Sequence, residues 1–169
     1  MTGYLDEKQY EEEDTQKGRY LTFTLEDNVY GIQIRFVTEI IGIQLATKVP
    51  ETPDYVKGII NLRGRIIPLI DVRLKFGKEE IEYNERTCII VIDVESVAVG
   101  LIVDKVDDVL TLDDSQIAQP PRSGSVGFEN RYIEGIGKVD DMVLLLLDAE
   151  KLLRAEEMEM METIASENV

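Results

Sequence analysis

Tyr55-Val56-Lys57-Gly58-Ile59 recurs 77 residues later (132 − 55 = 77) as Tyr132-Ile133-Glu134-Gly135-Ile136. The likeness continues without a gap to Phe76 in the first copy and to Leu153 in the second. Tyrosine, glycine and isoleucine recur in place. The chain therefore contains two copies of one unit.

An earlier segment is also repeated, at a separation of 69 residues (100 − 31 = 69). Its apolar and glycine positions agree: Leu21, Phe23, Leu25, Gly31, Ile32, Ile34 and Val37 align with Ile90, Ile92, Val94, Gly100, Leu101, Val103 and Val106. The second copy thus carries about eight extra residues (77 − 69 = 8), in the stretch between Asp113 and Asn130. Two copies are too few for a stacked repeat array. We expect two packed β-barrels or sheets, with a binding site at the seam between them.

Short β-rich runs dominate residues 19–147. Residues 21–25 alternate apolar and polar side chains, residues 26–28 supply turn residues, and residues 29–34 form the second arm of a hairpin. Residues 88–103 repeat the pattern. We expect Gly31 to mark a bend or bulge within its arm.

These strands predict a mainly β fold of two small five-stranded barrels. The first would cover about residues 19–80 and the second about 86–152, with the possibility that strands are exchanged between them. Asp71 caps a predicted single helical turn. The equivalent helix after Asp148 continues as an amphipathic C-terminal helix to Ile164, with residues 155–169 forming its end and a tail. The acidic residues 1–18 are predicted to be disordered.

Composition limits the class of protein. The 169 residues are 44% hydrophobic, which suffices for one ordinary core or two small ones. Lys+Arg 18 against Asp+Glu 34 gives a net charge of −16, which repels nucleic acids and anionic membranes. We find no apolar run long enough to span a bilayer and no signal peptide. The single cysteine, Cys88, fits a reducing compartment. We expect a cytoplasmic protein that neither binds nucleic acid nor inserts into a membrane.

Nothing in the sequence predicts a cofactor, a metal or a catalytic residue. The absence of histidine removes the commonest general base and the commonest transition-metal ligand. Neither a phosphate-binding loop nor a dinucleotide-binding motif is present. Acids at Asp104, Asp107, Asp108, Asp113 and Asp114 are most simply solvated loop residues. A small hydrolase that uses such carboxylates remains an alternative from another class of function.

Two charged residues lie beside apolar stretches. Glu39 lies within Val37-Thr38-Glu39-Ile40-Ile41, and Arg63 lies at the Asn61-Leu62-Arg63-Gly64 turn. Surface acids and arginines usually only increase solubility. An arginine flanked by apolar residues, however, is typical of a protein-binding hot spot.

Four segments together resemble the CheW-type family of chemotaxis coupling proteins: Tyr30-Gly31-Ile32, Val37-Thr38-Glu39-Ile40, Val56 to Gly64 and Ile67 to Arg73. The motif G-x-x-N-L-R-G followed by P-[ILV]-[ILV]-D-[ILV]-R is a specific signal, and the resemblance covers about residues 19–154. It implies two SH3-like five-stranded barrels packed through a shared apolar core.

The resemblance implies a non-enzymatic adaptor. It would couple the cytoplasmic tip of methyl-accepting chemoreceptors to the regulatory domain of the chemotaxis histidine kinase, in arrays at the inner face of the membrane. The same domain also ends the histidine kinase, so a detached regulatory module of a kinase is an alternative.

The resemblance further implies two sets of contact residues. A helical hairpin of the receptor would lie in a groove between the barrels, lined by Val37, Glu39, Ile40, Gly58, Arg63 and Val109. The kinase would contact the outer faces of the barrels, near Lys57 and Ile66 in the first copy and near the inserted loop, from Ala118 to Ser123, in the second.

Overall fold

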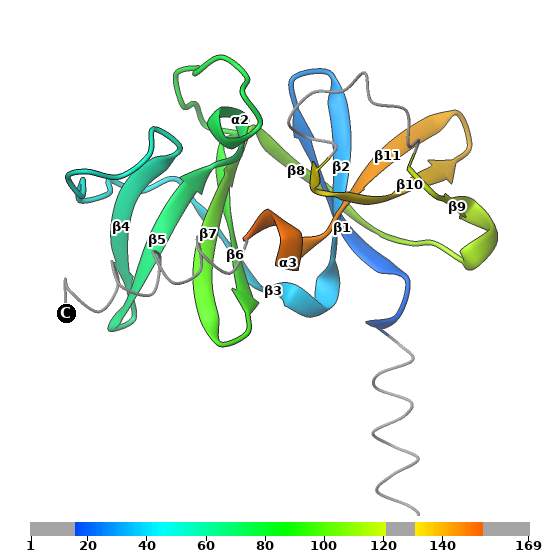
Figure 1. Ribbon diagram of the computed structural model, residues 1–169, viewed down its shortest axis with the longest axis horizontal. Helices are drawn as coiled ribbons and strands as arrows, with labels where there is room; N and C mark the ends of the chain where they lie inside the picture. The colour runs from blue at the N-terminus through cyan, green and yellow to red at the C-terminus, as the bar shows by residue number, and fades with distance from the viewer. Residues whose placement is uncertain (1–15, 121–130, 154–169) are drawn as a thin grey trace, which may run out of the picture.

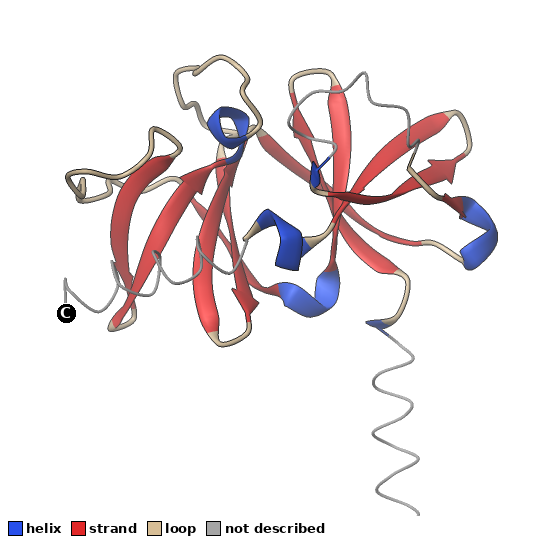
Figure 2. Ribbon diagram, in the orientation of Figure 1, coloured by secondary structure: helices blue, strands red, loops and turns tan. Residues whose placement is uncertain are grey.

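The computed structural model describes residues 16–120 and 131–153. Most of the predicted N-terminal tail, part of the inserted loop and the predicted C-terminal helix beyond Leu153 lie outside these residues. Within them the chain is mainly β-structure with helices of only three or four residues (Figure 2). The predicted fold class is confirmed.

The strands form two sheets (Figure 1). Sheet A has six strands in the order β8-β1-β2-β11-β10-β9: Lys105–Thr111, Arg19–Leu25, Asn28–Gln33, Met142–Leu147, Ile133–Val139 and Ile117–Ala118. Sheet B has five strands in the order β3-β6-β7-β5-β4: Val37–Gly42, Cys88–Val94, Val97–Val103, Arg65–Asp71 and Val56–Leu62. The short helices are η1 (Ile34–Phe36), α2 (Val72–Lys75), η2 (Asp114–Gln116) and α3 (Ala149–Leu152). The sixth strand of sheet A is β9, which pairs with β10 at Ile136 and Gly137; in sheet B the corresponding pairing is the single bridge between Thr47 and Ile59.

Each sheet takes strands from both repeats. The first repeat places β1 and β2 in sheet A and β3, β4 and β5 in sheet B. The second places β6 and β7 in sheet B and its remaining strands in sheet A. The hairpin that begins each repeat therefore completes the sheet in which the other repeat ends.

The strands of different repeats meet in parallel. Leu69 of β5 pairs with Gly100 of β7, and Leu146 of β11 pairs with Gly31 of β2. These two pairs are equivalent in the repeat, because 146 − 69 = 77 and 100 − 31 = 69. The two parallel pairings between the repeats therefore have the same register.

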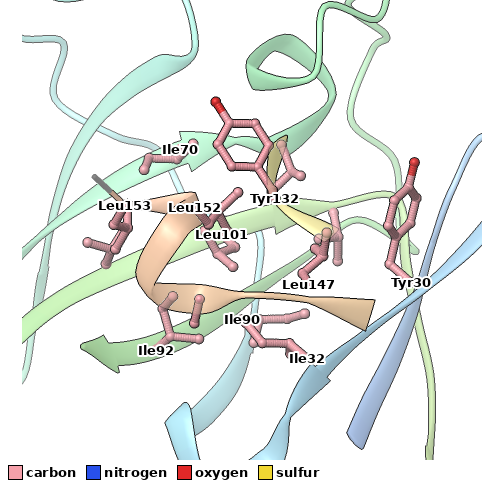
Figure 3. Packing of buried hydrophobic residues seen from close by; sticks show 14 of the residues in the cluster. Tyr30, Ile32, Ile70, Ile90, Ile92, Leu101, Tyr132, Leu147, Leu152 and Leu153 are labelled. Atoms are coloured by element: carbon pink, nitrogen blue, oxygen red, sulfur yellow. The ribbon is translucent and has the colours of Figure 1, made fainter. Parts of the chain in front are cut away.

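The main hydrophobic cluster lies between the sheets and includes residues of both. Figure 3 shows Ile32 and Leu147 of sheet A near Ile90 of sheet B, and the same cluster includes Leu152 and Leu153. The Asp148 side chain caps α3 by accepting hydrogen bonds from the amides of Glu150 and Lys151. Asp71 caps α2 in the same way, by accepting from the amide of Leu74. Each fully buried aliphatic side chain contributes about 1.5–3 kcal/mol. Buried hydrophobic side chains of both repeats thus fill the space between the two sheets.

A row of aromatic rings crosses the seam between the repeats. It consists of Phe23, Tyr30, Phe76 and Tyr132, with successive ring centroids 5.7, 5.6 and 5.6 Å apart. The ammonium group of Lys75, on α2, lies 4.3 Å from the ring centroid of Tyr55 and 5.5 Å from that of Tyr132. Tyr55 and Tyr132 are the equivalent tyrosines of the two copies, so Lys75 joins the repeats by cation–π contacts.

Gly31 does not mark a bulge. Its pairing is regular with both β1 and β11, so the prediction of a bend was wrong. A Cβ at Gly31 would lie 3.0 Å from Leu146 Cδ2, whereas one at Gly100 would lie 2.6 Å from Leu69 Cδ2 and 2.8 Å from Ile89 Cγ2. At both positions the absence of a side chain leaves room for a leucine of the neighbouring parallel strand.

Substitution of these two glycines tests that explanation. Gly100→Val should lower the free energy of unfolding by roughly 3 kcal/mol and Gly31→Val by roughly 1–2 kcal/mol, because overpacking forces the neighbours off their rotamers. Gly42→Val is the control, since no atom lies within 4 Å of its added Cβ. Chemical denaturation measures all three. Equal losses at Gly42 and Gly100 would contradict the explanation.

Candidate partner-binding surfaces

Glu39 and Arg63 form an ion pair. Arg63 lies in the β4–β5 turn at φ 52°, and the turn is closed by the amide of Gly64, which donates to Asn61 Oδ1 at 2.8 Å. The Arg63 side chain is 70% exposed and that of Glu39 is 26% exposed. The Glu39 carboxylate therefore orients a cation that remains available to a partner.

The ion pair joins β3, which carries Glu39, to the turn that follows β4, and β3 and β4 are the two edge strands of sheet B. The segment after β3 also reaches β4, because Thr47 and Ile59 exchange two backbone hydrogen bonds of 2.9 Å each. Gly58 lies beside this bridge at φ 137°, and a Cβ there would come within 2.4 Å of the Thr47 carbonyl oxygen. Gly58 is buried, so it shapes the edge and presents no side chain to a partner.

Ile40 and Val109 are exposed aliphatic residues on edge strands. Ile40 of β3 is 43% exposed and pairs with Ile90, while Val109 of β8 is 41% exposed and pairs with Leu21. The two positions are equivalent in the repeat (109 − 40 = 69). Val37, the remaining predicted receptor contact, is partly buried and packs against the main core.

The predicted kinase contacts are distributed over both sheets. Lys57 of β4 forms an ion pair with Glu80 and lines a cavity of about 500 Å³. Ile66 of β5 pairs with Asn61 and packs partly against the core. Ala118 lies on β9 at the edge of sheet A. Ser123 lies outside the described residues.

Sequence reasoning missed three exposed apolar side chains. Leu45 is 101% exposed, Val143 is 56% exposed and Met142 is 38% exposed. Val143 is the repeat equivalent of Ile66 (143 − 66 = 77). Comparison of the two copies at this position could have revealed it.

Three of the five acids considered for hydrolysis have structural partners. Asp104 accepts hydrogen bonds from Arg73, Asp107 accepts from Thr24, and Asp113 caps η2. In residues 16–120 and 131–153 no group of three or more acidic or cysteine side chains could hold a metal ion. The same residues contain no helix long and apolar enough to cross a bilayer. The geometry therefore gives the hydrolase alternative no support.

A second cavity, of about 940 Å³, lies at the start of β1 and is lined in part by Gln33 and Arg35. Gln33 links this cavity to Glu134: its amide donates to Glu134 Oε1 at 2.8 Å, and its own Oε1 accepts from Arg35 Nε at 2.8 Å. Burial raises the pKa of the Glu134 carboxyl. Glu134 is the repeat equivalent of Lys57 (134 − 57 = 77), so the corresponding strands carry opposite charges.

Comparison with known proteins identifies the family. Residues 19–157 match the family described as CheW-like domain. The chain belongs to the CheW family. It is 41% identical to the chemotaxis protein CheW of Klebsiella aerogenes, over 90% of this chain and 91% of that protein. Its identity with the chemotaxis protein CheW of Bacillus subtilis is 34%, over 82% of this chain and 88% of that one.

A solved structure agrees with this result. The scaffolding protein TtCheW from Thermoanaerobacter tengcongensis is 34% identical and superposes with a TM-score of 0.75, covering 83% of this chain and 94% of that one. The chain is thus a chemotaxis protein of a scaffolding family and not an enzyme. The predicted fold, family and non-enzymatic role are confirmed.

The Glu134 carboxyl predicts a pH effect on stability. Because its pKa is higher in the folded than in the unfolded protein, the folded state binds the proton more tightly, and stability falls as the pH rises from the ordinary glutamate value through the folded pKa. Glu134→Gln keeps an oxygen that accepts from Gln33 but removes the buried charge. We expect it to raise Tm by about 2 °C at pH 7.5 and by less at pH 4. A lower Tm at pH 7.5 would show that the charge is stabilising.

Proposed function

We propose that this protein is a cytoplasmic chemotaxis adaptor that binds the cytoplasmic tip of a chemoreceptor and the regulatory domain of the chemotaxis histidine kinase at the same time. It would act at the inner face of the membrane, within receptor arrays. The observation that carries the proposal is the exposed Arg63 guanidinium, which is oriented by its ion pair with Glu39. The residue after Glu39 on β3, Ile40, is an exposed apolar side chain.

The receptor contact would combine charge with apolar surface. An amphipathic helical hairpin offers an apolar stripe, which Ile40 and Val109 can cover, and flanking carboxylates, which Arg63 can bind. An exposed ion pair such as Glu39–Arg63 contributes only about 0–1 kcal/mol to stability. Its value to binding is that the arginine side chain is ordered before the partner arrives, which lowers the entropy lost on association.

The kinase contact would use the Lys57 and Ile66 surface of sheet B and the β9 edge with Ala118, together with Ser123 of the inserted loop. Lys57 and Ile66 lie on adjacent strands, β4 and β5. An edge strand such as β9 offers backbone groups as well as side chains to a partner. This arrangement would leave Arg63 for the receptor while the kinase is bound.

Receptor binding is tested by reversing one charge of the β4–β5 hairpin. Arg63→Asp should raise the Kd for a receptor cytoplasmic fragment at least 30-fold, or about 2 kcal/mol, because a paired charge is replaced by a repulsive one. Arg65→Asp is the matched control: Arg65 is 54% exposed and pairs with Asp93. The two variants have the same net charge. Isothermal titration at moderate salt distinguishes them, and equal Kd values would remove Arg63 from the contact.

Kinase binding is tested at Lys57. Lys57→Glu should weaken binding of the kinase regulatory domain about tenfold, because it reverses a charge on the proposed kinase surface and breaks the ion pair with Glu80. Binding of the receptor fragment should stay unchanged. Lys105→Glu, at a lysine that pairs with Asp107 on β8, is the control. A loss of receptor binding without a loss of kinase binding would mean that this surface has been assigned to the wrong partner.

A further inference from the structure

Arg73 is a buried cation in an otherwise mostly exposed set of charges. Its side chain is 9% exposed. Its Nε donates to both carboxylate oxygens of Asp104, at 2.7 and 2.9 Å. Its Nη1 donates to Glu26 Oε1 at 3.4 Å and to the Glu79 carbonyl oxygen at 3.2 Å. One guanidinium group is thus held by three separate segments.

The arginine and its two acidic partners come from the ends of strands in both sheets. Arg73 lies on α2, directly after β5 of sheet B, while Glu26 lies in the β1–β2 turn of sheet A. Asp104 is the residue between β7 of sheet B and β8 of sheet A. Its Oδ2 also accepts from the Glu26 amide at 2.9 Å. Arg73 therefore fixes the point at which the chain crosses from sheet B to sheet A.

The other crossover, from β2 to β3, lacks this arrangement. The repeat equivalents of Arg73 and Asp104 are Glu150 and Arg35 (150 − 73 = 77, 104 − 35 = 69), so the charges are exchanged. Both side chains are exposed, and Arg35 donates to Gln33. In the described part of the chain, the buried arginine is found at the β7–β8 crossover and not at its equivalent.

β8 depends on this crossover for its position. It is an edge strand that pairs with β1 alone. Its ladder with β1 is interrupted between Leu21 and Phe23, where the Thr22 hydroxyl donates to the Asp108 carbonyl oxygen at 2.9 Å. A strand with one neighbour and an interrupted ladder is held less firmly than an inner strand. The anchor at Asp104 supplies a further constraint at its beginning.

We propose that Arg73 is a positioning residue for receptor binding, which acts by holding Asp104 and thereby the placement of Val109 on β8. This inference rests on the proposed function, since it takes Val109 as a receptor contact. Arg73 itself is buried and does not touch the partner. Its effect should therefore appear as a dependence of the Val109 contact on Arg73.

A double-mutant cycle with a receptor cytoplasmic fragment tests this dependence. Arg73→Met has a similar length but no charge, and it should raise the Kd about tenfold. Val109→Ala should weaken binding in the wild-type background and clearly less in the Arg73→Met background. A loss of global stability alone would leave the two effects additive, and additivity would overturn the proposal. Arg65→Met, which removes an exposed ion pair of sheet B, is the control and should keep the wild-type Kd.

Hydrogen exchange gives a readout that needs no receptor. In Arg73→Met the amides of β8 should exchange faster, whereas those of β3, its repeat equivalent, should not change. If the wild-type protein does not bind the receptor fragment, the proposed function fails, and unchanged exchange in β8 would separately overturn the role of Arg73. The exchanged pair Arg73→Asp with Asp104→Arg should restore slow exchange in β8. If Arg73→Met does not melt cooperatively, Asp104→Asn takes its place, because it removes the charge that holds Arg73.

Discussion

Parallel pairing between strands of different repeats is the constraint on which the rest of the structure depends. β5 pairs with β7 and β2 pairs with β11 in the same register, so neither sheet is complete without both copies. The two sheets then bury one common core, into which Leu152 and Leu153 pack from the end of the second copy. We expect the described residues to unfold as one cooperative unit.

The duplication gives the two halves the same backbone, and the differences between the copies give them different surface charges. Arg63 and Asp140 occupy equivalent turns with the same φ of 52°, but they carry opposite charges. Lys57 corresponds to Glu134 in the same way, and Arg73 corresponds to Glu150. Two equivalent scaffolds with different charges can present different surfaces to different partners. This is what an adaptor that joins a receptor to a kinase requires.

Much of the local structure could be predicted because it depends on short-range chemistry. The hairpin turns, the cap formed by Asp71 and the two-copy organisation follow from residues close together in the chain. The distribution of strands between sheets could not be derived, because equal spacing does not say which copy supplies the neighbouring strand. Gly31 was misinterpreted because a glycine needed for close packing looks the same in sequence as one needed for a bulge. The burial of Arg73 was not foreseen, since arginine is almost never fully buried unless it is paired.

The most direct test of the adaptor account is sedimentation of the wild-type protein with a receptor cytoplasmic fragment and the kinase regulatory domain, alone and together. The account predicts that each partner binds by itself and that a three-component complex forms when both are present. Binding of the two partners in competition, so that one displaces the other, would contradict the claim that they use separate surfaces.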